Sequence, residues 1–236
     1  MTAADGLGHL TKRKLISHRG ASLMTFAALV LFSLSFAGAL AAYPGGTSFL
    51  GAQRGYAFWT NFWCDALHHP ALNGLPNQRG ARLASIAIWT LGAGLVPFWR
   101  VAAHVCVPPR AVAARGVVQL GGTLGMLGLM GVVLVPSNRF PWLHGVFVTI
   151  TGPCGILAAT LAILSAWRYR RVASWLSAVG LAALILAALS LAQYARQVWF
   201  HAPPTWLLPF AQKLATFLFL GWVVSVASIG FTRPTD

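Results

Sequence analysis

Acidic residues are almost absent from this chain. Its 236 residues contain three aspartates and no glutamate, and two of the aspartates, Asp5 and Asp236, lie close to the chain ends. Asp65 is therefore the single carboxylate in the body of the chain, and an internal cation that needs a protein anion must find this one. A proton-coupled transporter normally carries an acidic residue within a membrane span. The apolar stretches of this sequence contain none, which argues against that class.

Cysteine is scarce as well, and common catalytic motifs are missing. The three cysteines, Cys64, Cys106 and Cys154, lie far apart and form no CxxC pair, so they predict neither a disulfide framework nor a thiolate metal site. No GxSxG motif of a serine hydrolase occurs. The glycine-rich stretch 121–128 lies inside an apolar run, where small residues are typical of close helix packing rather than of a phosphate loop. The histidines stand near the ends of the apolar runs, which argues against a haem held between spans.

Apolar residues are what the chain has in abundance. Hydrophobic residues make up 57% of it, charged residues 8%, and the mean hydropathy is +0.70. A soluble domain carries roughly 25% charged residues, so the composition indicates a membrane protein. Six apolar runs reach the roughly 20 residues that cross a hydrocarbon layer about 30 Å thick. They lie at about 21–43, 81–103, 114–136, 142–167, 172–194 and 206–231.

We therefore predict an all-α polytopic bundle of six transmembrane helices that forms one domain, residues 21–231. A basic tail, 1–20, precedes it and a short tail, 232–236, follows it. The basic residues before the first run and the Ala-Leu-Ala at its end also fit a secretory signal. Its apolar run of about 20 residues is longer than the 7 to 15 of a signal peptide, so we expect a retained span.

The net charge of +14 comes from basic residues dispersed over the ends of the apolar runs, which favours membrane anchoring over nucleic-acid binding. Basic residues flank spans on the cytoplasmic side. If both termini are cytoplasmic, eleven basic residues lie on the cytoplasmic side and five on the opposite side. The cytoplasmic set is Lys12, Arg13, Lys14, Arg19, Arg100, Arg110, Arg115, Arg168, Arg170, Arg171 and Arg233. The opposite set is Arg54, Arg79, Arg82, Arg139 and Arg196. We expect a plasma membrane, cytoplasmic termini and an outer loop over 44–80.

The outer loop combines aromatic, amide and imidazole side chains in an otherwise apolar sequence. Residues 56–68 predict a short interfacial helix, which ends before Pro70 because the residue preceding a proline is disfavoured in helical geometry. On such a helix Asn61, Asp65 and His68 share one face. That face would point into the mouth of the bundle.

Polar residues of several spans converge on the same side of the membrane and predict a polar pocket there. Lys213 is the most demanding of them, because it lies about seven residues, roughly 10 Å, into the last span. Asp65 pairing with Arg82 or Lys213 would give a purely structural lock, and a bound lipid phosphate is the other available anion. The candidate pocket residues are Asn61, Asp65, His68, His69, Arg82, Arg139, His144, Arg196, Gln212 and Lys213.

A metal site is the third interpretation of this region. Asp65, one of the histidines at 68 and 69, and His144 supply a carboxylate and two imidazoles of the kind that hold a catalytic zinc. The His-His-Pro sequence is no established zinc motif, and the neighbouring arginines and Lys213 would repel a divalent cation. We predict no metal and no cofactor.

Several short motifs of the outer loop, together with a histidine that opens the fourth run, resemble a known family. They are Tyr43-Pro44-Gly45-Gly46, Gly55-Tyr56, Asn61-Phe62-Trp63-Cys64-Asp65, Asn73-Gly74, Asn77 and Leu143-His144-Gly145. The family is the prokaryotic six-span family labelled domain of unknown function 998, distantly similar to DRAM, FRAG and SFK-type proteins. The resemblance implies Asn61, Asp65 and His144 as site positions. This chain has Cys64-Asp65-Ala66-Leu67 where the family usually has Ser-Asp-Leu-Gly, so a role for that serine does not carry over.

The sequence favours a membrane protein that binds lipid headgroups, above all anionic ones, or a partner membrane protein through the outer pocket. The alternative is a membrane-embedded hydrolase or transferase acting on lipid, so the question of catalysis stays open. An enzyme would gather Asp65, His68 or His69, and His144 around an empty polar space. A structural lock would tie Asp65 to a cation without a cavity.

Overall fold

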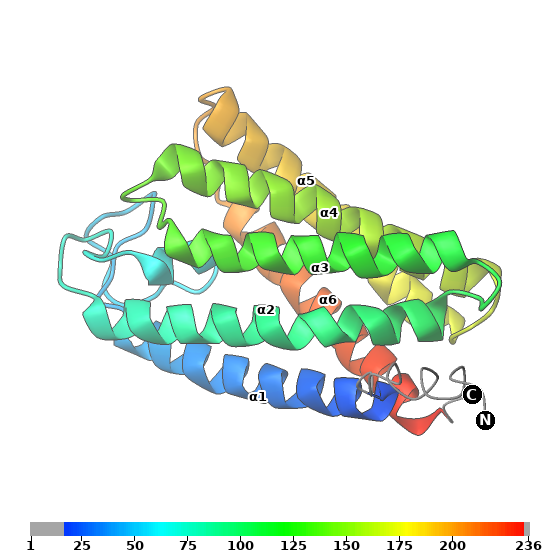
Figure 1. Ribbon diagram of the computed structural model, residues 1–236. Coiled ribbons are helices and arrows are strands. Elements are labelled where there is room, and N and C mark those ends of the chain that lie inside the picture. Colours follow the sequence, from blue (N-terminus) through cyan, green and yellow to red (C-terminus); the bar gives the residue numbers. More distant parts are fainter. Residues whose placement is uncertain (1–16, 234–236) are drawn as a thin grey trace, which may run out of the picture.

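The computed structural model describes residues 17–233, and within them six long helices form one bundle (Figure 1). The predicted tails fall largely outside the described part, up to residue 16 and from residue 234. One short 3₁₀ helix, η1, lies in the first connection. The elements are α1 His18–Ala42, η1 Trp63–Leu67, α2 Gln78–Cys106, α3 Val112–Leu134, α4 Pro141–Arg168, α5 Ser174–Trp199 and α6 Leu207–Thr232.

The predicted six-span fold is confirmed, since all six helices are long and apolar enough to cross a membrane. The chain is therefore a multi-pass membrane protein by the length and composition of its helices. The largest boundary difference is in α5, which runs to Trp199 rather than to 194. Hydropathy falls at Gln193 and Arg196, but glutamine and arginine are good helix formers, so the helix continues beyond its apolar part.

The helices alternate in direction, which creates two ends of different character (Figure 1). The described chain ends lie at one end, together with the connections 107–111 and 169–173; we call this the terminal end. The connections 43–77, 135–140 and 200–206 lie at the other, which we call the loop end. Asp65 belongs to the loop end, and the other charged side chains of the described part are Lys213 and arginines.

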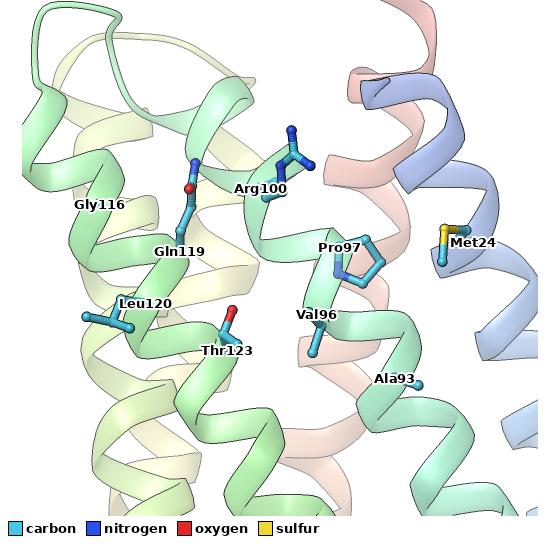
Figure 2. A pocket seen from close by; sticks show the side chains of 9 residues that line it. All are labelled: Met24, Ala93, Val96, Pro97, Arg100, Gly116, Gln119, Leu120 and Thr123. Atoms are coloured by element: carbon cyan, nitrogen blue, oxygen red, sulfur yellow. The ribbon is translucent and has the colours of Figure 1, made fainter. Parts of the chain in front are cut away.

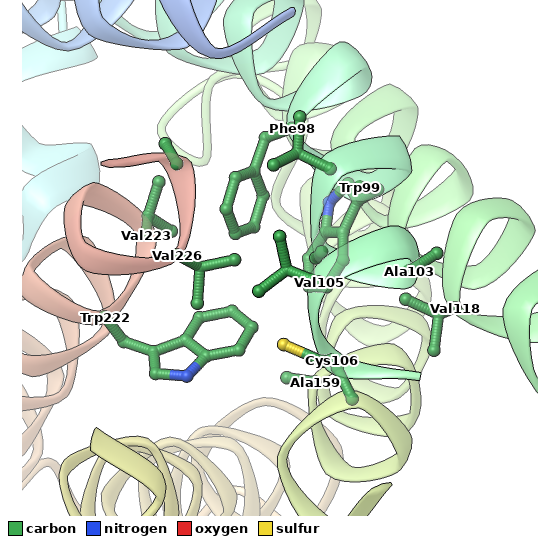
Figure 3. Packing of buried hydrophobic residues seen from close by; sticks show 14 of the residues in the cluster. Phe98, Trp99, Ala103, Val105, Cys106, Val118, Ala159, Trp222, Val223 and Val226 are labelled. Carbon is green, nitrogen blue, oxygen red and sulfur yellow. The ribbon is translucent and has the colours of Figure 1, made fainter. Parts of the chain in front are cut away.

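The core centres on α2, whose aromatic residues meet those of α6 (Figure 3). Phe98 and Trp222 pack edge to face with ring centroids 5.7 Å apart. Trp99 lies over Gly122 of α3, where a Cβ atom would overlap its ring. This contact confirms the predicted close-packing role of the glycine-rich stretch. Between membrane helices such packing contributes van der Waals contact, because lipid tails are as apolar as the core itself.

Arginines fasten the terminal end without any carboxylate. Arg171 donates to the backbone oxygens of His104 and Val105 at 3.1 and 3.2 Å, and Arg233 donates to Val105 at 3.2 Å. Arg115 donates to the oxygen of Val107 at 3.0 Å. These oxygens lie at or just beyond the end of α2, where carbonyl groups lack intrahelical donors and cations are favourable.

Candidate functional site

The loop 43–77 closes the loop end, and its central segment is not the helix predicted over 56–68. A turn at 57–61 is followed by the 3₁₀ helix η1. Asn61 Oδ1 accepts from the Ala57 amide at 2.8 Å, and Asp65 Oδ2 accepts from the Phe62 amide at 2.8 Å. In a continuous helix the Phe62 amide would donate to a backbone oxygen, and Asp65 takes this donor instead, which explains why the segment breaks into two turns.

Asn61 is the centre of the hydrogen-bond network in this loop. Its Nδ2 donates to the oxygen of Gly46 at 2.7 Å and to Asp65 Oδ2 at 2.9 Å. Its backbone oxygen accepts from Lys213 Nζ on α6. The side chain is fully buried, so the turn at 57–61, the first residues of the loop and α6 are held together at one residue.

The expected ion pair between Asp65 and Lys213 or Arg82 is not what the described residues form. The Asp65 carboxylate accepts hydrogen bonds from the Asn61 side chain and the Phe62 amide. The backbone oxygen of Asn61 accepts a hydrogen bond from the ammonium of Lys213. Arg82 is exposed on α2. The turn therefore inserts a peptide group between carboxylate and ammonium, so the two charges act on each other through space rather than by direct contact.

Lys213 is 0% exposed and lies within a cluster of aromatic rings that the sequence argument missed. Its Nζ is 5.7, 5.5 and 4.8 Å from the ring centroids of Tyr56, Phe58 and Trp63. Aromatic faces attract cations, more strongly where water is excluded. The rings and the Asn61 oxygen thus replace part of the hydration that the ammonium loses.

Burial dominates the electrostatics of the loop. It raises the pKa of Asp65 to about 6, although hydrogen bonds from Asn61 and Phe62 and the charge of Lys213 act in the opposite direction. It also raises the pKa of the Cys64 thiol to about 12, with the Asp65 charge as a second cause. A thiol rather than a thiolate is a poor nucleophile, which argues against covalent chemistry at Cys64.

The loop is also pinned to the connection between α3 and α4. His68 Nε2 lies 2.7 Å from Ser137 Oγ, and His144 Nδ1 lies 2.8 Å from the Val135 oxygen. Burial lowers the pKa of His68 to about 4, and the neighbouring His144 adds to the effect. Both imidazoles are buried and each has a hydrogen bond within the fold, while His68 Nδ1 has no partner among the described residues. The two hydrogen bonds favour a structural role for these histidines.

Asn77 and His69 complete the fastening of the loop. Asn77 Nδ2 donates to the His68 oxygen at 2.9 Å, and the Asn77 amide donates to His69 Nδ1 at 3.1 Å. Arg139 donates to the His69 oxygen at 3.4 Å. Within residues 17–233, no three His, Cys, Asp or Glu side chains are gathered so that they could hold a metal ion. The absence of a metal stays a prediction.

The predicted site residues thus divide into two groups. The loop end brings Asn61, Asp65 and Lys213 together, and Gln212 joins them by accepting from the Trp63 amide at 3.2 Å. The remaining members of this group are His68, His69, Arg139 and His144. Arg82 and Arg196 are exposed on other elements. The side chains of the first group are hydrogen-bonded to other groups of the protein and form a structural clamp.

A separate cavity with a largely apolar lining lies where α5 ends and α6 begins. It has a volume of about 430 Å³, and Gln193, Arg196 and Gln197 contribute polar side chains to a lining that also includes Trp206 and Leu207. Thr205 Oγ1 donates to Gln193 Oε1 at 3.3 Å. We call this cavity the Arg196 pocket. Of the predicted site residues only Arg196 lines it, and the polar pair Gln193 and Gln197 around it was the available signal in the sequence.

Comparisons of the chain with protein-family models, with curated proteins and with solved structures find no match.

Proposed function

We propose that this multi-pass protein binds the headgroup of an anionic membrane lipid in the Arg196 pocket. The observation that carries the proposal is the charge of that lining, which includes a guanidinium and two amides and no carboxylate. Arginine is suited to phosphate because its planar donors match two oxygens at once. Asp65, the only carboxylate among the described residues, is 4% exposed and bonded elsewhere.

Aromatic residues around the pocket support binding at the headgroup level. Trp199, Phe200 and Trp206 are exposed at the adjoining ends of α5 and α6. Tryptophan is enriched where hydrocarbon meets water, so these rings favour a position for the pocket at that boundary. A lipid phosphate lies at the same level.

The localisation that goes with this proposal is a prokaryotic plasma membrane with both termini in the cytoplasm. The eleven-to-five distribution of basic residues supports the orientation. The resemblance to the six-span family labelled domain of unknown function 998 supports the prokaryotic membrane. In this orientation the Arg196 pocket takes its lipid from the outer leaflet.

Lipid specificity tests the proposal. Phosphatidylglycerol added to the purified protein should raise its melting temperature more than phosphatidylcholine does, because a ligand at about 100 times its Kd stabilises by about 2.7 kcal/mol. Arg196→Gln should reduce the difference between the two lipids. Arg82→Gln, at an exposed arginine outside the pocket, should leave the difference in place. An equal response of all three proteins to both lipids would contradict the proposal.

The same preparations test the alternatives. A membrane protein that co-purifies stoichiometrically, and is lost in Arg196→Gln, would replace the lipid by a partner chain. Release of a headgroup from added lipid, abolished by Asp65→Asn, would replace binding by hydrolysis or transfer. We expect neither result, because Asp65 and His68 are buried and engaged in the loop network.

Cysteine labelling tests the orientation. Cys106 is buried and Cys64 is partly buried, so reporters are introduced at exposed serines, Ser48 in the loop 43–77 and Ser174 at the start of α5. In intact cells an impermeant maleimide should label Ser48→Cys, and it should label Ser174→Cys only after permeabilisation. The wild-type chain is the control for background labelling. The reverse pattern would place the termini outside.

A further inference from the structure

A second cavity lies near the terminal end, on the outer side of the bundle. Met24 of α1, Val96, Pro97 and Arg100 of α2, and Gln119 and Thr123 of α3 line a groove of about 590 Å³ (Figure 2). Met24 is 46% exposed, and Leu120 on the rim of the groove is 63% exposed. The groove is therefore open to the surroundings of the bundle, which are lipid tails for helices that span a membrane.

The lining combines a long apolar floor with a few polar groups at one end. Figure 2 shows Arg100 on α2 and Gln119 on α3 at the same end of the groove, with Val96 and Thr123 further along it. Pro97 has no amide hydrogen, so the backbone oxygen of Ala93, four residues earlier, lacks its usual helical donor. Both residues line the groove, which adds an acceptor for a hydroxyl group.

Arg100 lies six residues before the end of α2, about 9 Å along the helix axis. A cation at such depth requires an anion or a route to the interface. The only carboxylate of the described residues, Asp65, belongs to η1 in the loop 43–77, at the loop end. The other arginines at the terminal end, such as Arg171 and Arg233, cap backbone oxygens and supply positive charge rather than compensation.

We propose that this groove binds an anionic phospholipid from the leaflet at the terminal end, with its phosphate on Arg100 and Gln119 and an acyl chain along Val96 and Met24. Basic pockets between membrane helices are suited to such headgroups. A free phosphate would satisfy Arg100 but would leave the apolar length of the groove uncovered. The site is distinct from the Arg196 pocket, because it lies on other helices and at the other end of the bundle.

Native mass spectrometry of the purified protein with phosphatidylglycerol tests the role of the charge. Removing one charge-assisted contact should weaken binding about tenfold, so Arg100→Gln should retain correspondingly less lipid. Arg110→Gln is the matched control, since Arg110 is exposed at the same end but lies outside the groove. The proposal is overturned if both variants retain as much lipid as the wild type, or lose it equally. Inorganic phosphate that displaces the lipid through Arg100 would overturn the choice of a lipid.

A groove-filling variant tests the apolar part without touching the charge. Gly116 lines the groove, and a Cβ atom added there meets no atom within 4 Å. Gly116→Phe should fold normally and retain about tenfold less phosphatidylglycerol. Gly221→Phe on α6 is the control, because Gly221 is exposed and equally open. Unchanged lipid binding by Gly116→Phe would show that no acyl chain occupies the groove.

The two lipid proposals fail independently. In an Arg196→Gln background the Arg196 pocket no longer binds lipid, so a further loss of bound lipid on adding Arg100→Gln reports on the groove alone. If Arg196→Gln leaves lipid binding unchanged while Arg100→Gln and Gly116→Phe weaken it, the groove proposal stands and the proposal for the Arg196 pocket falls. If Arg100→Gln adds no loss in that background, the groove proposal falls.

Discussion

Replacement of Asn61 by alanine is expected to lower the free energy of unfolding by on the order of 3 to 5 kcal/mol. The change removes one hydrogen bond each from the Ala57 amide, the Gly46 oxygen and Asp65 Oδ2, and it leaves the Ala57 amide without a partner. A lost hydrogen bond costs about 0.5 to 1.5 kcal/mol, or about 1.5 to 3 kcal/mol at a charged group, and a buried group left without a partner costs about 1 to 3 kcal/mol. The contact to Lys213 uses the backbone oxygen and survives the change, so the loss reports on the side chain.

Thermal unfolding of the detergent-solubilised protein measures this effect. Asn138→Ala is the matched control, because Asn138 is exposed at the same end of the bundle, and exposed substitutions usually change stability by less than about 0.5 kcal/mol. If Asn61→Ala had the same melting temperature as Asn138→Ala, the Asn61 side chain would contribute nothing to stability, and the description of this network as a clamp would be wrong.

The fold was predictable from the sequence because a membrane imposes one strong requirement on it. Every backbone group inside hydrocarbon must be hydrogen-bonded, and an apolar run of about 20 residues has the length of a spanning helix. The end of α5 was missed because hydropathy marks the part of a helix that lies in the membrane, not the whole helix. At Arg196 the helix continues beyond its apolar part.

The loop end resisted prediction for a different reason. Periodicity placed Asn61 and Asp65 on one helical face, and they do meet, but through a turn whose geometry comes from side chains bonded to backbone. The distribution of charges predicted a carboxylate partner for Lys213, but it did not indicate that the rings of Tyr56 and Trp63 surround the ammonium. Which rings surround a cation depends on packing between distant segments, and spacing along one chain does not contain that information.

The pH dependence of stability should separate Asp65 from His68, because their proton affinities are shifted in opposite senses. The Asp65 pKa is raised from 3.8 to about 6, so the folded chain holds this proton after the unfolded chain has lost it. Its contribution to stability is complete below pH 3.8 and declines as the pH rises to 6. The His68 pKa is lowered from 6.5 to about 4, so its contribution is complete above pH 6.5 and declines as the pH falls to 4.

Each shift of two or more pKa units corresponds to about 3 kcal/mol. The two contributions oppose each other between pH 4 and 6, and each substitution removes one of them. Relative to the wild type, Asp65→Asn should therefore gain about 3 kcal/mol between pH 4 and 7. His68→Gln keeps a partner for Ser137 and should lose a similar amount over the same interval. Melting temperatures of the three proteins, recorded from pH 4 to 7.5, measure both differences.

Opposite slopes are the decisive feature, since a general weakening of the loop would shift the whole curve of either variant without changing its slope. His201→Asn is the control for histidine loss. His201 is exposed, and its φ of 52° is one that asparagine tolerates. Its ring is solvated whether or not the chain is folded, so this variant should run parallel to the wild type. Parallel curves for Asp65→Asn and His68→Gln as well would mean that neither side chain is buried as described. Slopes of the same sign would mean that Asp65 keeps its charge throughout, held by Lys213 more strongly than burial opposes it.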